Sequence, residues 1–235
     1  MEVILRNLFD KGQVITYRSK TEIKNKARDL EKGRDIGTQN AAWEIEIDQR
    51  ILEIEDGEKA HIIYRSTPVS IPMEAQMIGV LNKKQIIYVL MDTRGIILEA
   101  SGIGFQGIVN FPDGALKEGD TWQDSTDVEL PGLPQPVRQM RTFTLQGFET
   151  HGTYQCAKIS VASEEANLDI IAPDRVNTIK YSIKTTGEIL FAHKEGFLVK
   201  SMINSSFTSN FQSTVMEGHN LFTQELIEVK AKVPA

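Results

Sequence analysis

The sequence has a single cysteine, Cys156, among its 235 residues, so no disulfide can form within the chain. It also has no long apolar run: the longest, Ile86–Met91, is far short of the roughly 20 residues that a membrane-spanning helix requires. The first residues do not show the basic segment and apolar stretch of an export signal. We therefore expect a cytoplasmic protein without a transmembrane segment. The alternative is an exported or lipid-anchored protein whose signal has been removed.

Positive charge is also scarce. The chain has 26 Lys and Arg against 32 Asp and Glu, which gives a net charge of −6. A general binder of nucleic acid or of anionic membranes would show a basic surface, so we expect no nucleic-acid partner. Hydrophobic residues make up 40% of the chain and charged residues 25%, which excludes a disordered polypeptide.

Alternation with a period of two dominates the rest of the sequence. From Arg18 to Arg28 every even position is charged and every odd position is uncharged, and the segment Trp43–Arg50 alternates in a similar way. Such a pattern predicts two strands, each with one solvated face. Pairing opposite charges favours an antiparallel register, which is given by the pairs Glu22–Arg50, Lys24–Asp48, Lys26–Glu46 and Arg28–Glu44. A nucleic-acid-binding ribbon is an alternative interpretation of Arg18–Arg28, but neutralisation by the neighbouring strand explains these charges.

Glycine-bearing turns separate further predicted strands. Ile86–Met91 and Ile96–Ala100 flank a turn that ends at Gly95, where glycine allows the left-handed backbone. In the same way, a turn at Lys184–Gly187 is predicted to separate two strands, and Lys194–Gly196 leads into a long one. The other predicted strands are Arg141–Leu145, Gln155–Val161, Phe197–Phe207 and Leu221–Val229.

Helical periodicity is confined to Met73–Leu81, with at most a single turn at Ser163–Leu168. The sequence therefore predicts an all-β fold, an antiparallel curled sheet or β-sandwich with one or two short helices.

Two segments of the chain resemble each other. Residues 91–104 and 183–196 share Thr, Gly, Ile, Leu, Ala and a final Gly at the same positions. This self-similarity predicts an internal duplication in which residues 1–104 and 105–235 are related β-meander halves. Each half alone would leave an apolar face uncovered, so we expect the two halves to share one core.

Three motifs mark starts of strands and turns: Leu5–Gln13 followed by Tyr17, Phe111–Trp122 with its Lys-Glu-Gly-Asp sequence, and Phe143–Gly147 with Gly152–Ile159. Together they resemble a large uncharacterised family of bacterial all-β proteins. The resemblance implies the same fold, and family members are often exported or lipid-anchored, whereas this sequence lacks a visible export signal. It implies no activity and no catalytic residue.

No motif identifies a reaction. The sequence has no His-Glu-x-x-His, no Cys-x-x-Cys, no phosphate-binding loop and no Gly-x-Ser-x-Gly elbow. Gly102-x-Gly104-x-x-Gly107 matches a dinucleotide fingerprint, but a predicted strand follows it in place of the required helix, so we predict no cofactor. The four histidines lie far apart and lack partners at metal-ligand spacing, so we predict no metal site. We interpret Cys156 as a small core residue and not as a nucleophile.

An acidic cluster supports an alternative function. Asp113, Asp120, Asp124 and Asp127 lie close together in the sequence. Such carboxylates could serve a hydrolase or a calcium site, but the spacing lacks the regular ligands and the closing Glu of a calcium loop. Turn and capping roles explain these residues better, and a hydrolase remains the alternative.

Three aromatic residues, Tyr17, Phe111 and Trp122, are predicted at starts of strands in the two halves. Core packing explains them, and the alternative is that they bind a ligand at the mouth of a cavity. Alternating apolar strands with six adaptable methionines besides Met1 would suit a hydrophobic guest. We therefore predict a non-enzymatic binding or scaffold protein that holds an apolar small molecule, or a protein partner at a sheet face or edge. A self-assembling structural module is a further alternative.

Overall fold

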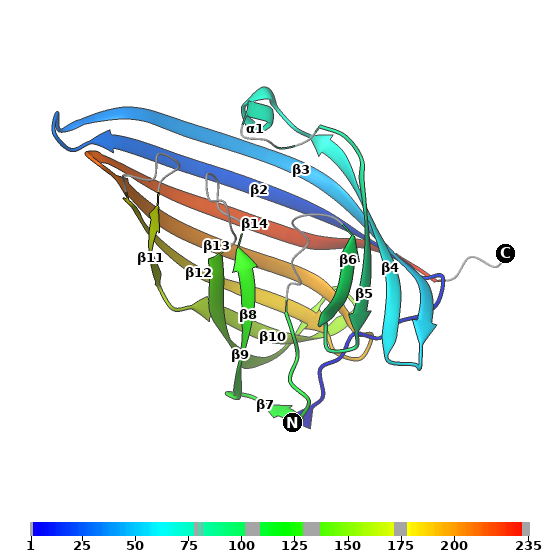
Figure 1. Cartoon of the computed structure of the whole chain (residues 1–235). Coiled ribbons are helices and arrows are strands. Elements are labelled where there is room, and N and C mark those ends of the chain that lie inside the picture. The colour runs from blue at the N-terminus through cyan, green and yellow to red at the C-terminus, as the bar shows by residue number, and fades with distance from the viewer. Residues whose placement is uncertain are drawn as a thin grey trace.

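Figure 1 shows the computed structural model of the chain, which describes residues 2–77, 80, 82–101, 109–128, 137–171 and 178–231. Strands make up most of these residues, so the predicted all-β antiparallel fold is confirmed. The strands are β1 (Glu2–Val3), β2 (Val14–Asp29), β3 (Arg34–Glu55), β4 (Lys59–Ser70), β5 (Gln85–Asp92), β6 (Ile97–Ser101), β7 (Leu116–Lys117), β8 (Thr121–Val128), β9 (Val137–His151), β10 (Tyr154–Ser163), β11 (Ala166–Ile171), β12 (Thr178–Ala192), β13 (Phe197–Phe211) and β14 (Thr214–Lys230).

One antiparallel sheet of 12 strands contains nearly all of them, in the order β6-β5-β4-β3-β2-β14-β13-β12-β10-β9-β8, with β11 paired to β12 beside this path. The sheet curls so that its two ends, at β6 and β8, come round to the front of the view in Figure 1. β1 and β7 form a separate two-stranded sheet. The first and last long strands, β2 and β14, lie side by side in the middle of the large sheet, which places the two halves of the chain in one sheet.

The β2–β3 pairing is antiparallel as predicted, but the predicted register is wrong. Arg18 lies opposite Glu46, whereas Glu22 lies opposite Ala42 and Lys26 opposite Thr38. The turn occupies only residues 30–33, so the hairpin closes tightly and the turn sets the register, not the sum of the charge pairs. The charged positions still share one face, where Arg18 and Glu46 form an ion pair of 3.3 Å.

Two of the predicted glycine turns are confirmed and one is wrong. Gly95 and Gly196 close turns with positive φ angles of 88° and 74°. Gly187 lies inside the uninterrupted strand β12, where it pairs with Val161 of β10 and Ile203 of β13. Pairing on both sides keeps this segment extended. The similar segments around Gly95 and Gly187 thus differ in local structure, and the duplication stays a prediction.

The helical predictions are confirmed in part. Met73–Met77 forms the short helix α1, which contacts β3. The predicted turn at Ser163–Leu168 is wrong, because β10 runs to Ser163 and β11 begins at Ala166. Within the described residues, no helix is long and apolar enough to cross a membrane.

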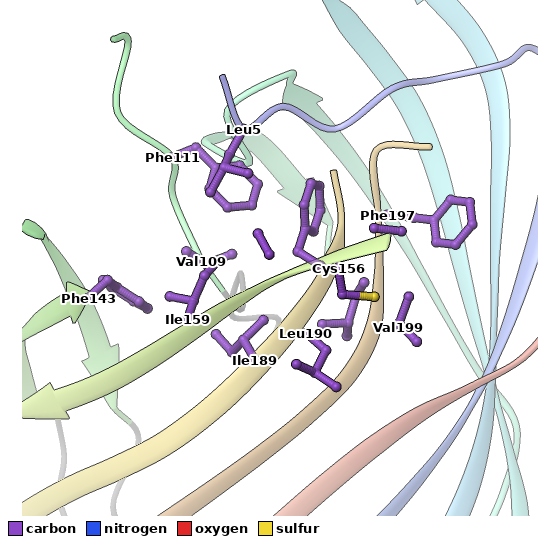
Figure 2. Close-up of a cluster of buried hydrophobic side chains, with 14 of the residues drawn as sticks. Leu5, Val109, Phe111, Phe143, Cys156, Ile159, Ile189, Leu190, Phe197 and Val199 are labelled. Atoms are coloured by element: carbon purple, nitrogen blue, oxygen red, sulfur yellow. The ribbon is translucent and has the colours of Figure 1, made fainter. Parts of the chain in front are cut away.

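The main hydrophobic core fills one end of the curled sheet. Leu5, Val109 and Phe111 come from segments inside the curl and belong to the same buried cluster as Ile159 and Ile189 on β10 and β12 (Figure 2). Arg6 fixes the N-terminal segment there, because its guanidinium donates hydrogen bonds of 2.6 and 2.8 Å to the carbonyls of residues 112 and 113. A smaller cluster joins β3, β4 and β5 and consists of Ile51, Ala60, Ile62, Val89 and Met91.

Candidate ligand-binding face

The face of the sheet that carries the main core is called here the inner face. On β2 it holds the odd positions, because Ile15 and Tyr17 are buried in that core. The strand pairing extends this assignment to even positions of β14 and odd positions of β13. The part of the inner face that lies beyond the core, toward the turns at residues 30–33 and 212–213, is called the distal face.

Several large apolar side chains of the distal face on β2, β3, β13 and β14 are only half-buried and belong to neither core cluster, whereas Tyr181 and Ile183 on β12 are buried. Trp43, Thr21 and Phe222 form one row across β3, β2 and β14. Ile23 and Phe207 are further half-buried members. An apolar surface that is concave and incompletely covered is the kind of surface that takes up an apolar small molecule.

A row of polar residues lies between this apolar surface and the core. Ser19 on β2, Gln224 on β14 and Ser201 on β13 are direct cross-strand neighbours. Ser19 and Ser201 are 1% and 0% exposed, and their hydroxyls have no hydrogen-bond partner within the described part of the chain. Leaving a buried hydroxyl unpaired costs about 1–3 kcal/mol, so this row is unfavourable for folding alone.

A second polar group is fully hydrogen-bonded. The Gln139 amide donates a hydrogen bond of 2.9 Å to the Ser163 hydroxyl. The same hydroxyl accepts a hydrogen bond of 2.8 Å from the Thr185 backbone N–H. The Thr185 hydroxyl lies 3.1 Å from both Gln139 Oε1 and Ser205 Oγ. This closed network ties β9, β10, β12 and β13 together and makes the wall of the inner face rigid.

Gly218 allows an aromatic ring to lie flat against the sheet. The Phe207 ring stacks on Tyr181 with centroids 5.5 Å apart, and a Cβ at Gly218 would come within 2.2 Å of it. The same Cβ would be 2.5 Å from Asn25 Oδ1. Absence of a side chain on β14 therefore shapes the distal face around Phe207.

The predicted ligand-binding residues lie in the core. Tyr17, Phe111 and Trp122 are all buried members of the main cluster. Phe111 packs edge-on against Phe191, and Trp122 stacks on Phe143 and donates 2.8 Å to the Asn110 carbonyl. A ligand role for these three stays a prediction, because their contacts are with the protein itself.

Sequence reasoning missed Ser19, Ser201, Trp43 and Phe222. The one available signal was that the odd positions of β2 mix apolar with uncharged polar residues, whereas a strand over a plain core carries apolar residues there.

The predicted acidic cluster does not form one site among its described side chains. Asp113 is 81% exposed and pairs with Arg94 at 3.0 Å, and Asp120 accepts 2.7 Å from the Lys117 backbone N–H within a turn. Asp124 is 6% exposed and accepts hydrogen bonds of 2.9 and 2.7 Å from Arg141. The side chain of Asp127 lies outside the described residues. The three carboxylates thus have separate structural partners, and the hydrolase stays an untested alternative.

Two predictions concerned metals and cofactors. No group of three or more His, Cys, Asp or Glu that could hold a metal occurs among the described residues. His61 is engaged by Tyr88 and Glu55, each at 2.7 Å. The Gly102–Gly107 motif lies outside the described residues.

We expect Cys156 to be unreactive in the folded protein. The side chain is buried on β10, and burial, with a smaller effect of the Glu195 charge, raises the pKa of its thiol to about 11. Near about pH 8, roughly one thiol in a thousand is then the nucleophilic thiolate. Labelling with Ellman's reagent should be at least roughly a hundredfold slower in the native protein than in guanidinium chloride. A Ser206→Cys thiol in the outer face is the control, and native Cys156 labelling at the rate of that control would contradict the prediction.

A separate cleft lies at the opposite end of the molecule. Its volume is ≈ 500 Å³, and the N-terminal segment forms it together with the turns near Gly57, Thr93 and Glu195. Asp10, Lys194 and Glu195 give its lining several charges. It therefore differs in chemistry from the distal face.

A scan against known protein families finds no match, and a search of curated proteins finds none. The resemblance to a bacterial family stays a prediction, and the functional argument below uses the residues of this chain alone.

Proposed function

We propose that the protein is a non-enzymatic binding protein that holds an apolar, elongated small molecule on the distal face. One observation carries the proposal: Trp43, Ile23 and Phe222 are half-buried on the concave side of the sheet, outside both core clusters. Side chains of this size on an inner face are normally covered by a core, because exposing them to water is unfavourable.

The physical basis of binding would be removal of apolar surface from water. Each methylene group that leaves water contributes about 0.8 kcal/mol, so a chain of several methylenes along the distal face can offset the cost of immobilising a small molecule. The hydrogen-bonded network around Thr185 keeps the wall of the site in place before binding, which lowers that cost.

The neutral fluorophore N-phenyl-1-naphthylamine tests this proposal. We expect its fluorescence to rise on addition of the protein and to saturate. The variant Ile23→Asp places a carboxylate in the middle of the distal face and should weaken binding at least roughly tenfold, since a charge there must be desolvated.

Lys24→Asp is the matched control, because Lys24 is the next residue on β2 and points to the exposed outer face. It should bind the fluorophore as the parent chain does. Phe222→Ala supplies a second test if Ile23→Asp does not fold, and it should also weaken binding. The proposal would be overturned if folded Ile23→Asp or Phe222→Ala bound the fluorophore as the parent chain does. It would also be overturned if the parent chain did not bind the fluorophore.

A further inference from the structure

The inner face is uncharged over its central strands. At the inner-face positions of β2 (odd, 15–27), β3 (odd, 37–49), β12 (odd, 179–189), β13 (odd, 199–211) and β14 (even, 216–226), all of them described, there is no Asp, Glu, Lys, Arg or His. The opposite face of β2 carries a charge at every position from Arg18 to Arg28. The contrast between the two faces of one strand is therefore almost complete.

Charges on the neighbouring strands do not change this. Among the described inner-face side chains of β8, β9 and β10, Asp124 and Arg141 are charged. They neutralise each other through a bidentate ion pair. The buried phenols stay neutral as well: desolvation raises the pKa of Tyr181 to about 12 and raises that of Tyr17 further. The described side chains of the face therefore offer no net charge to a ligand across the physiological pH range.

The polar groups of the face are hydrogen-bonding groups without charge. Besides the two unpaired serine hydroxyls, the Oδ1 atoms of Asn25 and Asn220 are buried without a partner in the described structure. The Asn25 Nδ2 atom donates a hydrogen bond of 3.4 Å to Gln39 Oε1. These groups can pair with a hydroxyl or an amide but cannot neutralise a carboxylate or an ammonium ion.

We propose that the ligand, given the binding function above, is an uncharged amphiphile. Its apolar chain lies along Ile23, Trp43 and Phe222. Its hydroxyl or amide group bonds to the Ser19–Gln224–Ser201 row when the side chains that cover these groups in the free chain move aside, because Ser19 and Ser201 are 1% and 0% exposed. A charged head group would lose its hydration there without a counter-ion, whereas a neutral hydroxyl satisfies hydroxyls that are unpaired in the chain alone.

Three probes with the same apolar chain separate head-group charge from apolar contact: dodecanol, dodecanoate and dodecylammonium. Each is titrated against the bound fluorophore at about pH 8, where the acid and the amine are ionised. We expect dodecanol to displace the fluorophore at a concentration at least roughly tenfold lower than either ion. Lowering the pH should leave displacement of the fluorophore by dodecanol unchanged. It should make dodecanoate a better competitor, because the protonated acid is neutral.

The Ser19→Ala/Ser201→Ala double variant tests the polar row. This variant should bind dodecanol roughly tenfold more weakly and should still bind the fluorophore. Its thermal stability should be kept or raised, since two unpaired buried hydroxyls are removed. Ser206→Ala on the outer face of β13 is the matched control and should change none of these.

The outcomes distinguish this inference from the proposed function. If the fluorophore binds but dodecanoate or dodecylammonium displaces it as well as dodecanol does, the inference fails and the binding function stands. Unchanged dodecanol displacement in the double serine variant would remove the polar row from the site. If the fluorophore does not bind at all, both proposals fail.

Discussion

Substitution of Gly187 by alanine is expected to lower the free energy of unfolding by about 2–3 kcal/mol. A Cβ at this position would lie 2.5 Å from the Met202 carbonyl oxygen and 2.7 Å from Ile203 Cδ1. The Ile203 side chain can rotate away, but Met202 belongs to β13, which is paired with β12 on one side and β14 on the other. The backbone oxygen therefore cannot move without disturbing the centre of the sheet. Urea denaturation followed by circular dichroism measures the loss.

Gly37→Ala is the matched control for this prediction. Gly37 also lies inside a long strand, β3, but a Cβ there would have no atom within 4 Å. Since alanine restricts the unfolded chain more than glycine does, this variant should be unchanged or more stable by about 0.5 kcal/mol. If Gly187→Ala were as stable as Gly37→Ala, the close packing of β12 on β13 would be contradicted.

Gly187 also shows why one part of the fold could not be predicted from the sequence. Thr185-Thr186-Gly187 resembles Thr93-Arg94-Gly95, and the local sequence predicts a turn for both. Only the second segment forms one. At Gly187 the glycine is needed because a carbonyl of a neighbouring strand approaches closely, and local sequence does not contain that information.

The faces of the strands were easier to predict than their register. Side-chain direction alternates along any strand, so the charges from Arg18 to Arg28 place their own face in solvent whatever the partner is. Register depends on where the hairpin closes, and the tight turn at residues 30–33 shifts the pairs away from those that charge alone favours. Ion pairs on exposed faces are too weak to decide against a turn.

The candidate site could be predicted least of all. Trp43 and Phe222 come from segments far apart in the sequence, and they meet only because β2 pairs with β14 and with β3. Nothing in either segment indicates that pairing. Aromatic residues at strand starts were a reasonable choice by composition, yet Phe111 and Trp122 are covered by the core. The uncharged odd positions of β2 were visible, but their meaning depends on knowing which strands lie beside them.

Substitution of Asp124 by alanine is expected to lower the free energy of unfolding by about 3 kcal/mol, which corresponds to a melting temperature lower by roughly 6–12 °C. The Asp124 and Arg141 side chains are 6% and 13% exposed, so the pair is shielded from water. Arg141 also lies over the Phe143 ring at 5.2 Å from its centroid. Removal of the carboxylate takes the Asp124 partner away from a guanidinium that is shielded from water. Thermal unfolding followed by circular dichroism checks the prediction.

Two further variants show whether the effect comes from burial of the charge. Asp113→Ala removes a carboxylate that also pairs with an arginine, but this pair is on the surface, where Asp113 is 81% exposed, and stability should hardly change. Asp124→Leu combined with Arg141→Met replaces the buried pair by apolar groups and should recover most of the loss, because both charges of the pair are removed together. If the double variant were as unstable as Asp124→Ala, the loss would come from packing at the end of the sheet.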